Sequence, residues 1–251
     1  MRKKISIVVF LFFYIGLFAS ENDSLINNAN KQYSEGLYTK AIENYQKVID
    51  KGYTSSELFF NLGNSYFKMN DLPSSILYYE RARRLAPNDD DIQFNLKIAN
   101  SRIPDKIEKV PELFFKQWWN SFYNMFSVNN WAKITILMFV ISLVFIGVFV
   151  LSKQRRIKII NFWLGILFFL VFVFSFSLSY QKYIYSQKHH EAIVFTSTIT
   201  IKSSPNINSV DLFVIHEGSK LIITDKVDDW FEIRIANGGV GWLLQSSVKI
   251  I

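Results

Sequence analysis

The run Ile134–Tyr180 decides the architecture of this chain: ITILMFVISLVFIGVFVLSKQRRIKIINFWLGILFFLVFVFSFSLSY. Two long apolar stretches flank a short basic segment, and no charged residue lies within either stretch. At about 1.5 Å per residue, each stretch can cross a hydrocarbon core of about 30 Å as a helix. A bilayer cannot hydrogen-bond exposed backbone, so helices are the expected spanning form. We therefore predict a two-helix transmembrane hairpin with spans at 132–151 and 159–180.

The segment between the spans, residues 152–158, sets the predicted orientation. Its basic residues are Lys153, Arg155, Arg156 and Lys158. Basic residues in short loops stay on the cytoplasmic side of a membrane. We therefore expect the parts before and after the hairpin to lie together on the opposite, extracytoplasmic side.

The start of the chain has the layout of a secretory signal over residues 1–20. Arg2, Lys3 and Lys4 precede an apolar stretch at 5–19. A cut after residue 19 or 20 would leave Leu17 or Phe18 at the minus-three position, where a small residue is usual. An uncleaved signal anchor therefore remains an alternative. Both versions export the residues that follow, in agreement with the orientation of the hairpin.

Composition narrows the function classes. The chain has 251 residues, is 50% hydrophobic, carries a formal net charge of +7, and contains no cysteine and three histidines. The densest basic cluster lies between the spans, where topology explains it, so the charge does not indicate nucleic acid. The sequence lacks a phosphate loop, a dinucleotide-binding glycine pattern, a zinc-protease helix and a nucleophile elbow. We expect no enzyme activity, no cofactor and no metal site.

The exported N-terminal part contains an internal repeat at an offset of 34 residues. Small residues align with small ones and large residues with large ones. The aligned pairs are Leu25 with Phe59, Ala29 with Gly63, Ala41 with Ser75, Ile42 with Ile76, Tyr45 with Tyr79, and Val48 with Ala82. Each unit is predicted to form two helices, A and B, with Pro73 in the first turn of the second helix B.

This pattern resembles the tetratricopeptide repeat. The unit Ser56–Asp89 has the signature positions Phe59, Leu62, Gly63, Tyr66, Ser75, Tyr79, Ala82 and Pro87, with Ser75 in place of the usual Ala and Phe59 in place of the usual Trp. The unit 22–55 matches less well, and 90–103 resembles a third helix A that caps the stack. The resemblance implies an all-α helical repeat over residues 22–103.

Stacks of this family resemble peptide-binding scaffolds, with a groove lined by the A helices. The predicted groove residues are Asn30, Asn61, Asn64, Asn95, Phe60, Phe67 and Lys68. Asn side chains suit an extended peptide because each offers donors and an acceptor to backbone groups. The alternative is that the asparagines are solvated positions on exposed helix faces. Ile26 and Asp91 stand where the carboxylate-clamp subtype has basic residues, so that subtype is not matched.

Residues 104–131 are predicted to be a linker followed by an amphipathic helix. In ELFFKQWWNSFYNMF, aromatic residues recur every three or four positions and so share one helix face. Trp and Tyr favour the membrane–water boundary. We expect this helix to lie on the outer leaflet before the first span, and a dock for a partner's helix is the alternative.

From residue 192 to 251 the pattern changes to the period of two that is typical of strands. Asn237-Gly238-Gly239 predicts a tight hairpin turn. The segments IKSSP, HEGSKLII, DDWFEIRIANG and VGWLL resemble the bacterial SH3 domain, which implies an all-β SH3-like small barrel. Trp230 and Trp242 are its candidate surface residues, although we favour a place in the core for both. Because bacterial domains of this kind resemble wall binders, peptidoglycan is the alternative ligand.

The order of segments, which predicts a multidomain membrane protein, resembles the BatE-type proteins of bacterial aerotolerance (Bat) operons. That resemblance implies a multi-pass protein of the bacterial inner membrane with both soluble domains in the periplasm. It also implies envelope partners: membrane proteins with von Willebrand factor A domains and a MoxR-type ATPase system. The implied role is a scaffold or adaptor in envelope stress tolerance.

Overall fold

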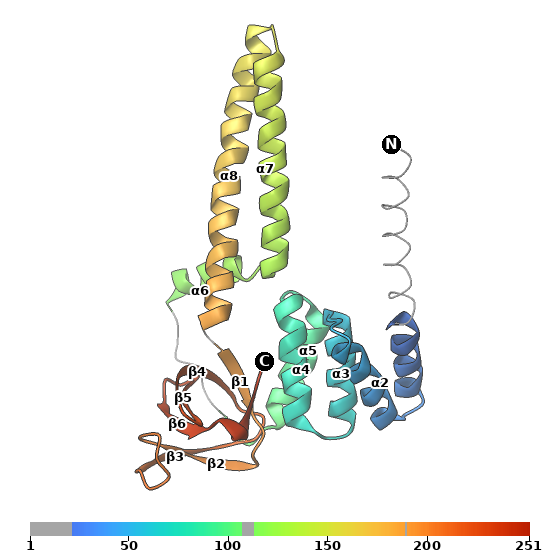
Figure 1. Cartoon of the computed structure of the whole chain (residues 1–251), viewed down its shortest axis with the longest axis vertical. Coiled ribbons are helices and arrows are strands. Elements are labelled where there is room, and N and C mark those ends of the chain that lie inside the picture. The colour runs from blue at the N-terminus through green and yellow to red at the C-terminus, as the bar shows by residue number, and fades with distance from the viewer. Residues whose placement is uncertain (1–21, 107–112, 189) are drawn as a thin grey trace.

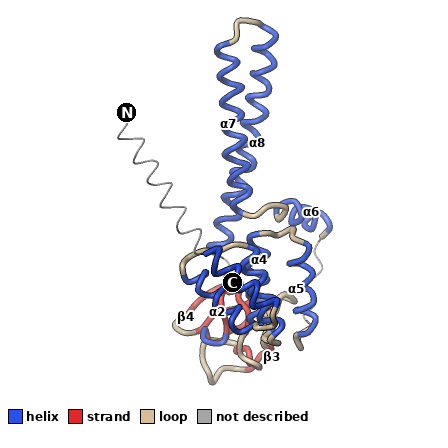
Figure 2. Tube along the Cα trace, turned by 90° about the vertical axis from the view of Figure 1, so that its right-hand side faces the viewer, coloured by secondary structure: helices blue, strands red, loops and turns tan. Residues whose placement is uncertain are grey.

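A computed structural model describes residues 22–106, 113–188 and 190–251 of the chain. The predicted signal segment 1–20 lies outside the described residues. A long helical hairpin projects from a globular part that combines a stack of helices with a β-sheet (Figure 1). The helical stack and the sheet both lie at one end of the hairpin (Figure 2).

The N-terminal part is the predicted stack of A and B helices. It comprises a helix over residues 22–34, α2 (Tyr38–Asp50), α3 (Ser56–Lys68), α4 (Leu72–Leu85) and α5 (Asp90–Arg102). Side chains just before three of these helices cap their first turns: Ser55 accepts from Leu58 N–H, Asp71 from Ser74 N–H, and Asp89 from Asp91 and Ile92 N–H. Such caps satisfy backbone donors that have no partner within the helix. Pro73 lies in the first turn of α4, as predicted.

The small residues of the repeat allow the helices to pack closely. Ala29, Ala41 and Ser75 are fully buried. A Cβ atom added to Gly63 would lie 2.6 Å from the ring of Tyr79, so no larger residue fits there without movement. The predicted alignment at an offset of 34 therefore reflects equivalent packing positions in consecutive repeats.

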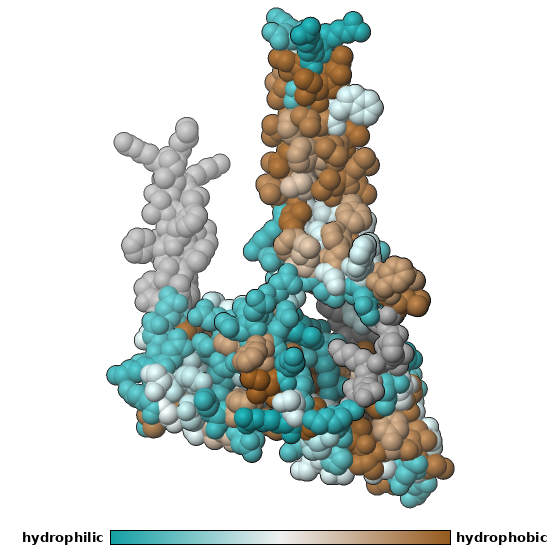
Figure 3. Space-filling model, turned by 180° about the vertical axis from the view of Figure 1, so that it is seen from behind, coloured by the Kyte–Doolittle hydropathy of each residue, from teal (hydrophilic) through white to brown (hydrophobic). Residues whose placement is uncertain are grey.

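The hairpin consists of α7 (Val128–Leu151) and α8 (Arg155–Lys188), both long and apolar enough to cross a membrane. Both helices extend beyond the predicted spans. Arg155, Arg156 and Lys158 belong to α8 rather than to a loop, and Lys153 lies in the short turn between the helices. The surface of the hairpin is hydrophobic along its length and hydrophilic at the tip, which points away from the globular part (Figure 3).

Small and hydroxyl-bearing residues hold the two hairpin helices together. Thr135 Oγ1 donates to Ser175 Oγ at 3.2 Å, and Ser142 Oγ donates to the carbonyl of Gly165 at 3.1 Å. A Cβ atom on Gly165 would lie 3.3 Å from Ile146, so its absence permits this close approach. These contacts give the polar side chains of an otherwise apolar hairpin hydrogen-bond partners.

The predicted amphipathic helix is α6 (Phe114–Tyr123), which lies across the base of the hairpin (Figures 1 and 2). Its aromatic residues are exposed apart from the half-buried Tyr123, and Trp118 is 80% exposed. Lys182 of α8 donates to the carbonyls of Tyr123 and Phe126 at 3.2 and 2.8 Å, and Trp131 Nε1 donates to Tyr123 at 3.2 Å. Because terminal carbonyls lack partners within a helix, these donors fix α6 to the hairpin.

The C-terminal part is one antiparallel sheet of seven strands in the order β3-β2-β6-β5-β4-β1-β7. The strands are β1 (His190–Val194), β2 (Thr198–Lys202), β3 (Asp211–His216), β4 (Lys220–Val227), β5 (Trp230–Ile235), β6 (Val240–Leu244) and β7 (Val248–Ile250). The predicted turn joins β5 to β6, with Gly238 at a φ of 93°. Within the described residues the strand ladder remains open, so a closed SH3-like barrel is not confirmed.

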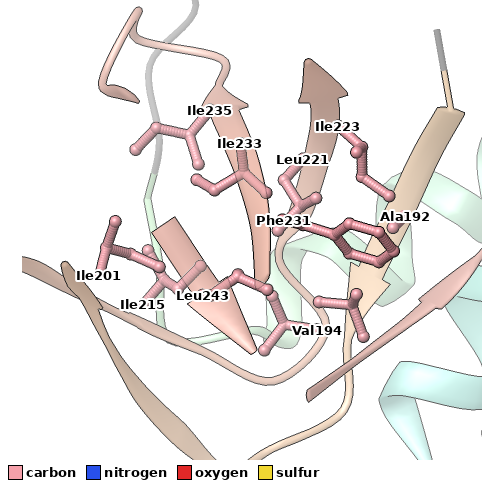
Figure 4. Packing of buried hydrophobic residues seen from close by; sticks show 11 residues of the cluster. Ala192, Val194, Ile201, Ile215, Leu221, Ile223, Phe231, Ile233, Ile235 and Leu243 are labelled. Atoms are coloured by element: carbon pink, nitrogen blue, oxygen red, sulfur yellow. The ribbon is translucent and has the colours of Figure 1, made fainter. Parts of the chain in front are cut away.

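The sheet folds around its own core. Alternate residues of each strand point to one side, where branched side chains meet Phe231 (Figure 4). Ile201 and Ile215 come from the β2–β3 end and Val194 comes from near the other end, yet all three belong to this cluster. The sheet must therefore be strongly curved.

The sheet also packs directly against the helical stack, which sequence analysis treated as a separate part. Ile193 of β1 is fully buried in a cluster with Ile76, Leu96 and Ile103 from the stack. Gly218 makes the contact possible, because a Cβ there would lie 2.5 Å from Ile103 Cγ2.

Charged groups border this apolar contact. Glu80 of α4 is only 4% exposed, and its carboxylate lies 2.6 Å from Arg83 and 3.1 Å from Lys220 Nζ. Lys220 also pairs with Glu191 at 2.9 Å. Burial opposes ionisation of Glu191, but the ammonium of Lys220 holds the pKa of that carboxyl below its ordinary value.

Asp105, just after the stack, supplies a second polar link to the sheet. Its carboxylate accepts from the backbone N–H of His216 at 2.7 Å and from Ser219 Oγ at 2.5 Å, and it lies 2.7 Å from His216 Nδ1. Arg81 of α4 also donates to the carbonyl of Ile250 at 2.9 Å. The side chains of the stack thus bind the sheet at several separate points.

Candidate peptide-binding groove

Four of the predicted groove residues form two equivalent hydrogen-bond networks. Asn30 Oδ1 accepts from Tyr45 O–H at 2.5 Å and from Asn61 Nδ2 at 3.3 Å. One repeat later, Asn64 Oδ1 accepts from Tyr79 O–H at 2.6 Å and from Asn95 Nδ2 at 2.8 Å. The recurring asparagines are therefore parts of a recurring structure rather than independent solvated side chains.

Each network fixes which end of its central amide faces outward. Burial raises the pKa of both Tyr45 and Tyr79 to about 12, so their hydroxyls stay protonated near neutral pH. Because Asn64 Oδ1 already accepts two hydrogen bonds, Nδ2 is the polar atom of this side chain that remains for other partners. Among the described residues Asn64 Nδ2 has no hydrogen-bond acceptor, so it can donate to a ligand.

A cavity of about 240 Å³ lies next to the second network. Its lining residues are Tyr33, Asn64, Phe67, Lys68, Tyr79, Asn95 and Ile98. This volume is below the range of about 300–1,000 Å³ that is usual for small-molecule sites. The cavity therefore suits one side chain of a larger ligand.

Four of the predicted groove residues line the cavity, Asn64, Asn95, Phe67 and Lys68, and the other three do not. Phe60 is half-buried and packs on Tyr79 with ring centroids 5.9 Å apart. Asn30 and Asn61 belong to the first network, away from the cavity lining.

Tyr33, Tyr79 and Ile98 also line the cavity, although they are not among the predicted groove residues. Their role as cavity lining depends on neighbouring repeats coming together. The recurrence of Tyr45 as Tyr79 was the available signal, although it was interpreted only as packing. Arg102 lies beside one lining residue, because its guanidinium carbon is 4.4 Å from the centroid of the Phe67 ring.

The candidate surface residues of the sheet lie outside its core, contrary to the interpretation that we favoured. Trp230 pairs with Leu244, and Trp242 pairs with Glu232 on the adjacent strands. Both tryptophans alternate with the core residues Phe231 and Leu243 and are half-buried. They therefore share the outer face of the β5–β6 pair.

Comparison with known families supports the repeat assignment. Residues 56–89 match the tetratricopeptide repeat family, and these are the bounds of the second predicted unit. No curated protein sequence matches the chain. The tetratricopeptide repeat is a non-catalytic interaction fold, so the match indicates a role in protein–protein interaction. Within the described residues no group of three or more His, Cys, Asp and Glu side chains is arranged to hold a metal ion.

Proposed function

We propose that this chain is a non-enzymatic, membrane-anchored adaptor whose A-helix groove binds an extended segment of an envelope protein. The observation that carries the proposal is the fixed amide of Asn64 beside the cavity. Tyr79 and Asn95 hold this side chain before any ligand arrives. A group that is already ordered loses less conformational entropy on binding, which favours a specific complex.

The proposed setting is the bacterial inner membrane, with the stack and the sheet on the periplasmic side. Two features support it: the basic residues gather at the hairpin tip, and the globular parts lie at the opposite end. The exposed aromatic residues of α6 support a position for this helix in the outer leaflet, beside the ends of α7 and α8.

Single cysteines test this topology cleanly because the native chain contains no cysteine. Gln154→Cys places a thiol in the turn at the hairpin tip, and Ser197→Cys places one in the exposed bend between β1 and β2. In intact cells stripped of their outer membrane, an impermeant maleimide should label only Ser197→Cys. Labelling of both positions, or of Gln154→Cys alone, would contradict the proposed orientation.

The proposal extends to the physiological setting through the order of segments, which resembles the BatE-type proteins. On that basis the partners are Bat membrane proteins with von Willebrand factor A domains, together with a MoxR-type ATPase system. The role is then to assemble or hold an aerotolerance or envelope-stress complex at the membrane.

The groove is tested by an isosteric change, Asn64→Asp. The aspartate keeps oxygens that can accept from Tyr79 and Asn95, but it replaces the outward amide with a carboxylate oxygen. Asn28→Asp is the matched control because Asn28 is exposed on the first helix, outside the cavity lining. Tagged full-length proteins are crosslinked in native membranes and purified. Envelope partners should be lost with Asn64→Asp and kept with Asn28→Asp. Retention of the partners by both variants would exclude the groove as their binding site.

A second candidate function, binding of peptidoglycan by the sheet, is favoured by the outward positions of Trp230 and Trp242. The full-length protein is the right sample, since isolating the sheet would expose Ile193 and its neighbours. Sedimentation with purified peptidoglycan should fall in Trp230→Ala/Trp242→Ala if this function is correct. A soluble fraction that peptidoglycan leaves unchanged would rule it out.

A further inference from the structure

The cavity in the groove opens beside two exposed cations that occupy the same position in consecutive repeats. Lys68 lies in the last turn of α3, and Arg102 lies in the last turn of α5. The guanidinium of Arg102 lies over the ring of Phe67, the residue that precedes Lys68. Within the described ranges, no carboxylate lies within 4.0 Å of the charged nitrogens of either residue.

Acidic residues occupy the other end of the same helices. Glu57 and Asp91 lie in the first turns of α3 and α5. Lys68 follows Glu57 by eleven positions, which corresponds to roughly 16 Å along a helix. That distance exceeds the screening length of about 8 Å at physiological salt. Lys68 is therefore largely screened from Glu57, and the same spacing separates Arg102 from Asp91. Asp91 itself lies one helical turn before the lining residue Asn95.

The groups around the cavity are mostly hydrogen-bond donors. Asn64 presents its Nδ2, Lys68 its ammonium, and Tyr33 a hydroxyl at the cavity wall, and no carboxylate is among the lining residues. Phe67 and Ile98 supply apolar surface on the same wall. A complementary ligand must therefore bring a negatively charged acceptor next to an apolar group.

We propose that this cavity is a subsite for an acidic side chain adjacent to an apolar one in an extended peptide. The inference rests on the proposed function and narrows its ligand. The positions that the carboxylate-clamp subtype uses hold Ile26 and Asp91 in this chain. The anion site proposed here lies instead at the C-terminal ends of the A helices, where Lys68 and Arg102 supply the positive charge.

The test uses the full-length protein in lipid nanodiscs and a displayed library of random-sequence peptides. The native protein is compared with Lys68→Glu/Arg102→Glu and with the control Lys40→Glu/Lys226→Glu, which makes the same charge change at exposed residues away from the cavity. Circular dichroism confirms that each variant is folded. The native protein and the control should enrich Asp or Glu beside an aromatic or aliphatic residue, whereas Lys68→Glu/Arg102→Glu should enrich Lys or Arg.

Binding of one enriched peptide then gives the magnitude. Replacing its acidic residue with the matching amide should weaken binding to the native protein about tenfold or more. The same replacement should have little effect with Lys68→Glu/Arg102→Glu. Added salt should appreciably weaken binding of the acidic peptide to the native protein, and should have little effect on binding of the amide peptide.

The outcomes separate the two proposals. Enriched peptides that bind the native protein and not Asn64→Asp, yet carry no acidic preference, would overturn the acidic subsite and leave the adaptor function intact. A native protein that enriches no peptide beyond the level seen with Asn64→Asp would overturn both.

Discussion

Lys220 in the sheet and Glu80 in the helical stack are 140 residues apart in sequence, and their side chains meet at 3.1 Å. The carboxylate of Glu80 is buried, so it depends on Lys220 and Arg83 for compensation of its charge. The apolar cluster around Ile193 continues the same contact. The stack and the sheet therefore form one unit, and a change at their boundary should affect both.

Gly218→Ala should break this boundary. The new Cβ would lie 2.5 Å from Ile103 Cγ2, and the backbone φ of 83° is itself unfavourable for alanine. We expect a loss of about 2–4 kcal/mol in the free energy of unfolding, measured by urea titration in detergent with tryptophan fluorescence. Gly238→Ala is the control, because it has a similar φ of 93° and open space around it, so about 1–2 kcal/mol should be lost. Equal losses would show that the Ile103 contact is unimportant.

Asp105 should make the stack–sheet contact sensitive to acid. Burial alone would raise the pKa of its carboxyl, but hydrogen bonds from Ser219 and His216 outweigh burial and lower it. A lowered pKa in the folded state contributes stability that is complete above the ordinary carboxyl range and is lost as pH falls through the lowered value. We expect the urea concentration at the midpoint of unfolding to decrease once the pH falls below about 4.

The acid sensitivity is assigned by comparing two substitutions. Asp105→Asn should show a shallower loss of stability between about pH 5 and about pH 3 than the native protein. Asp23→Asn, at an exposed position of the first helix, should keep the native pH profile. If Asp105→Asn also keeps the native profile, another group must be responsible.

Tyr79→Phe should separate the binding role of the second network from its structural role. Removing the hydroxyl takes a 2.6 Å hydrogen bond from Asn64 and should cost about 1 kcal/mol of stability. It should also weaken peptide binding, because the Asn64 amide is then free to rotate. Tyr45→Phe removes the equivalent bond to Asn30 and should cost about the same stability while leaving binding at the cavity unchanged. Calorimetry and peptide titration measure the two effects, and equal binding losses would contradict the assignment.

Lys182→Met should release α6 from the hairpin. The ammonium bonds the carbonyls of Tyr123 and Phe126, and methionine keeps the apolar stem without the donors. In nanodiscs, hydrogen exchange should become faster in α6 while remaining slow in α7. Lys133→Met is the control for loss of an exposed charge near the same end of the hairpin. Unchanged exchange in α6 after Lys182→Met would mean that aromatic contacts alone hold this helix.

Local patterns were sufficient to predict the elements of this fold. The 34-residue recurrence located the repeats because small residues such as Gly63 are required wherever helices touch. Uninterrupted apolar runs located the hairpin, although its helices extend further because polar residues such as Asn129 and Gln181 also adopt helical geometry at the ends. The asparagine spacing identified two of the seven residues that line the cavity, Asn64 and Asn95.

The contact between the stack and the sheet could not be predicted from these patterns. Ile193 appears in the sequence as an ordinary apolar residue of a strand, and its burial against α4 depends on a distant segment. Glu80 and Asp105 likewise resemble solvated surface acids until their partners Lys220 and Ser219 are known. For Trp230 and Trp242, surface and core positions are both compatible with the sequence, and the core is the one we favour, whereas strand alternation places them outside the core.

One hydrogen bond, from Asn88 Nδ2 to the carbonyl of Met125 at 2.7 Å, joins the α4–α5 turn to the start of the hairpin. The helices of the stack run in about the same direction as α7 and α8 (Figure 1). A peptide that crosses the A helices would therefore run across the direction of the hairpin, beyond its base, and keep about the same distance from that base from the first repeat to the last. Additional repeats would lengthen such a groove without moving it farther from that base.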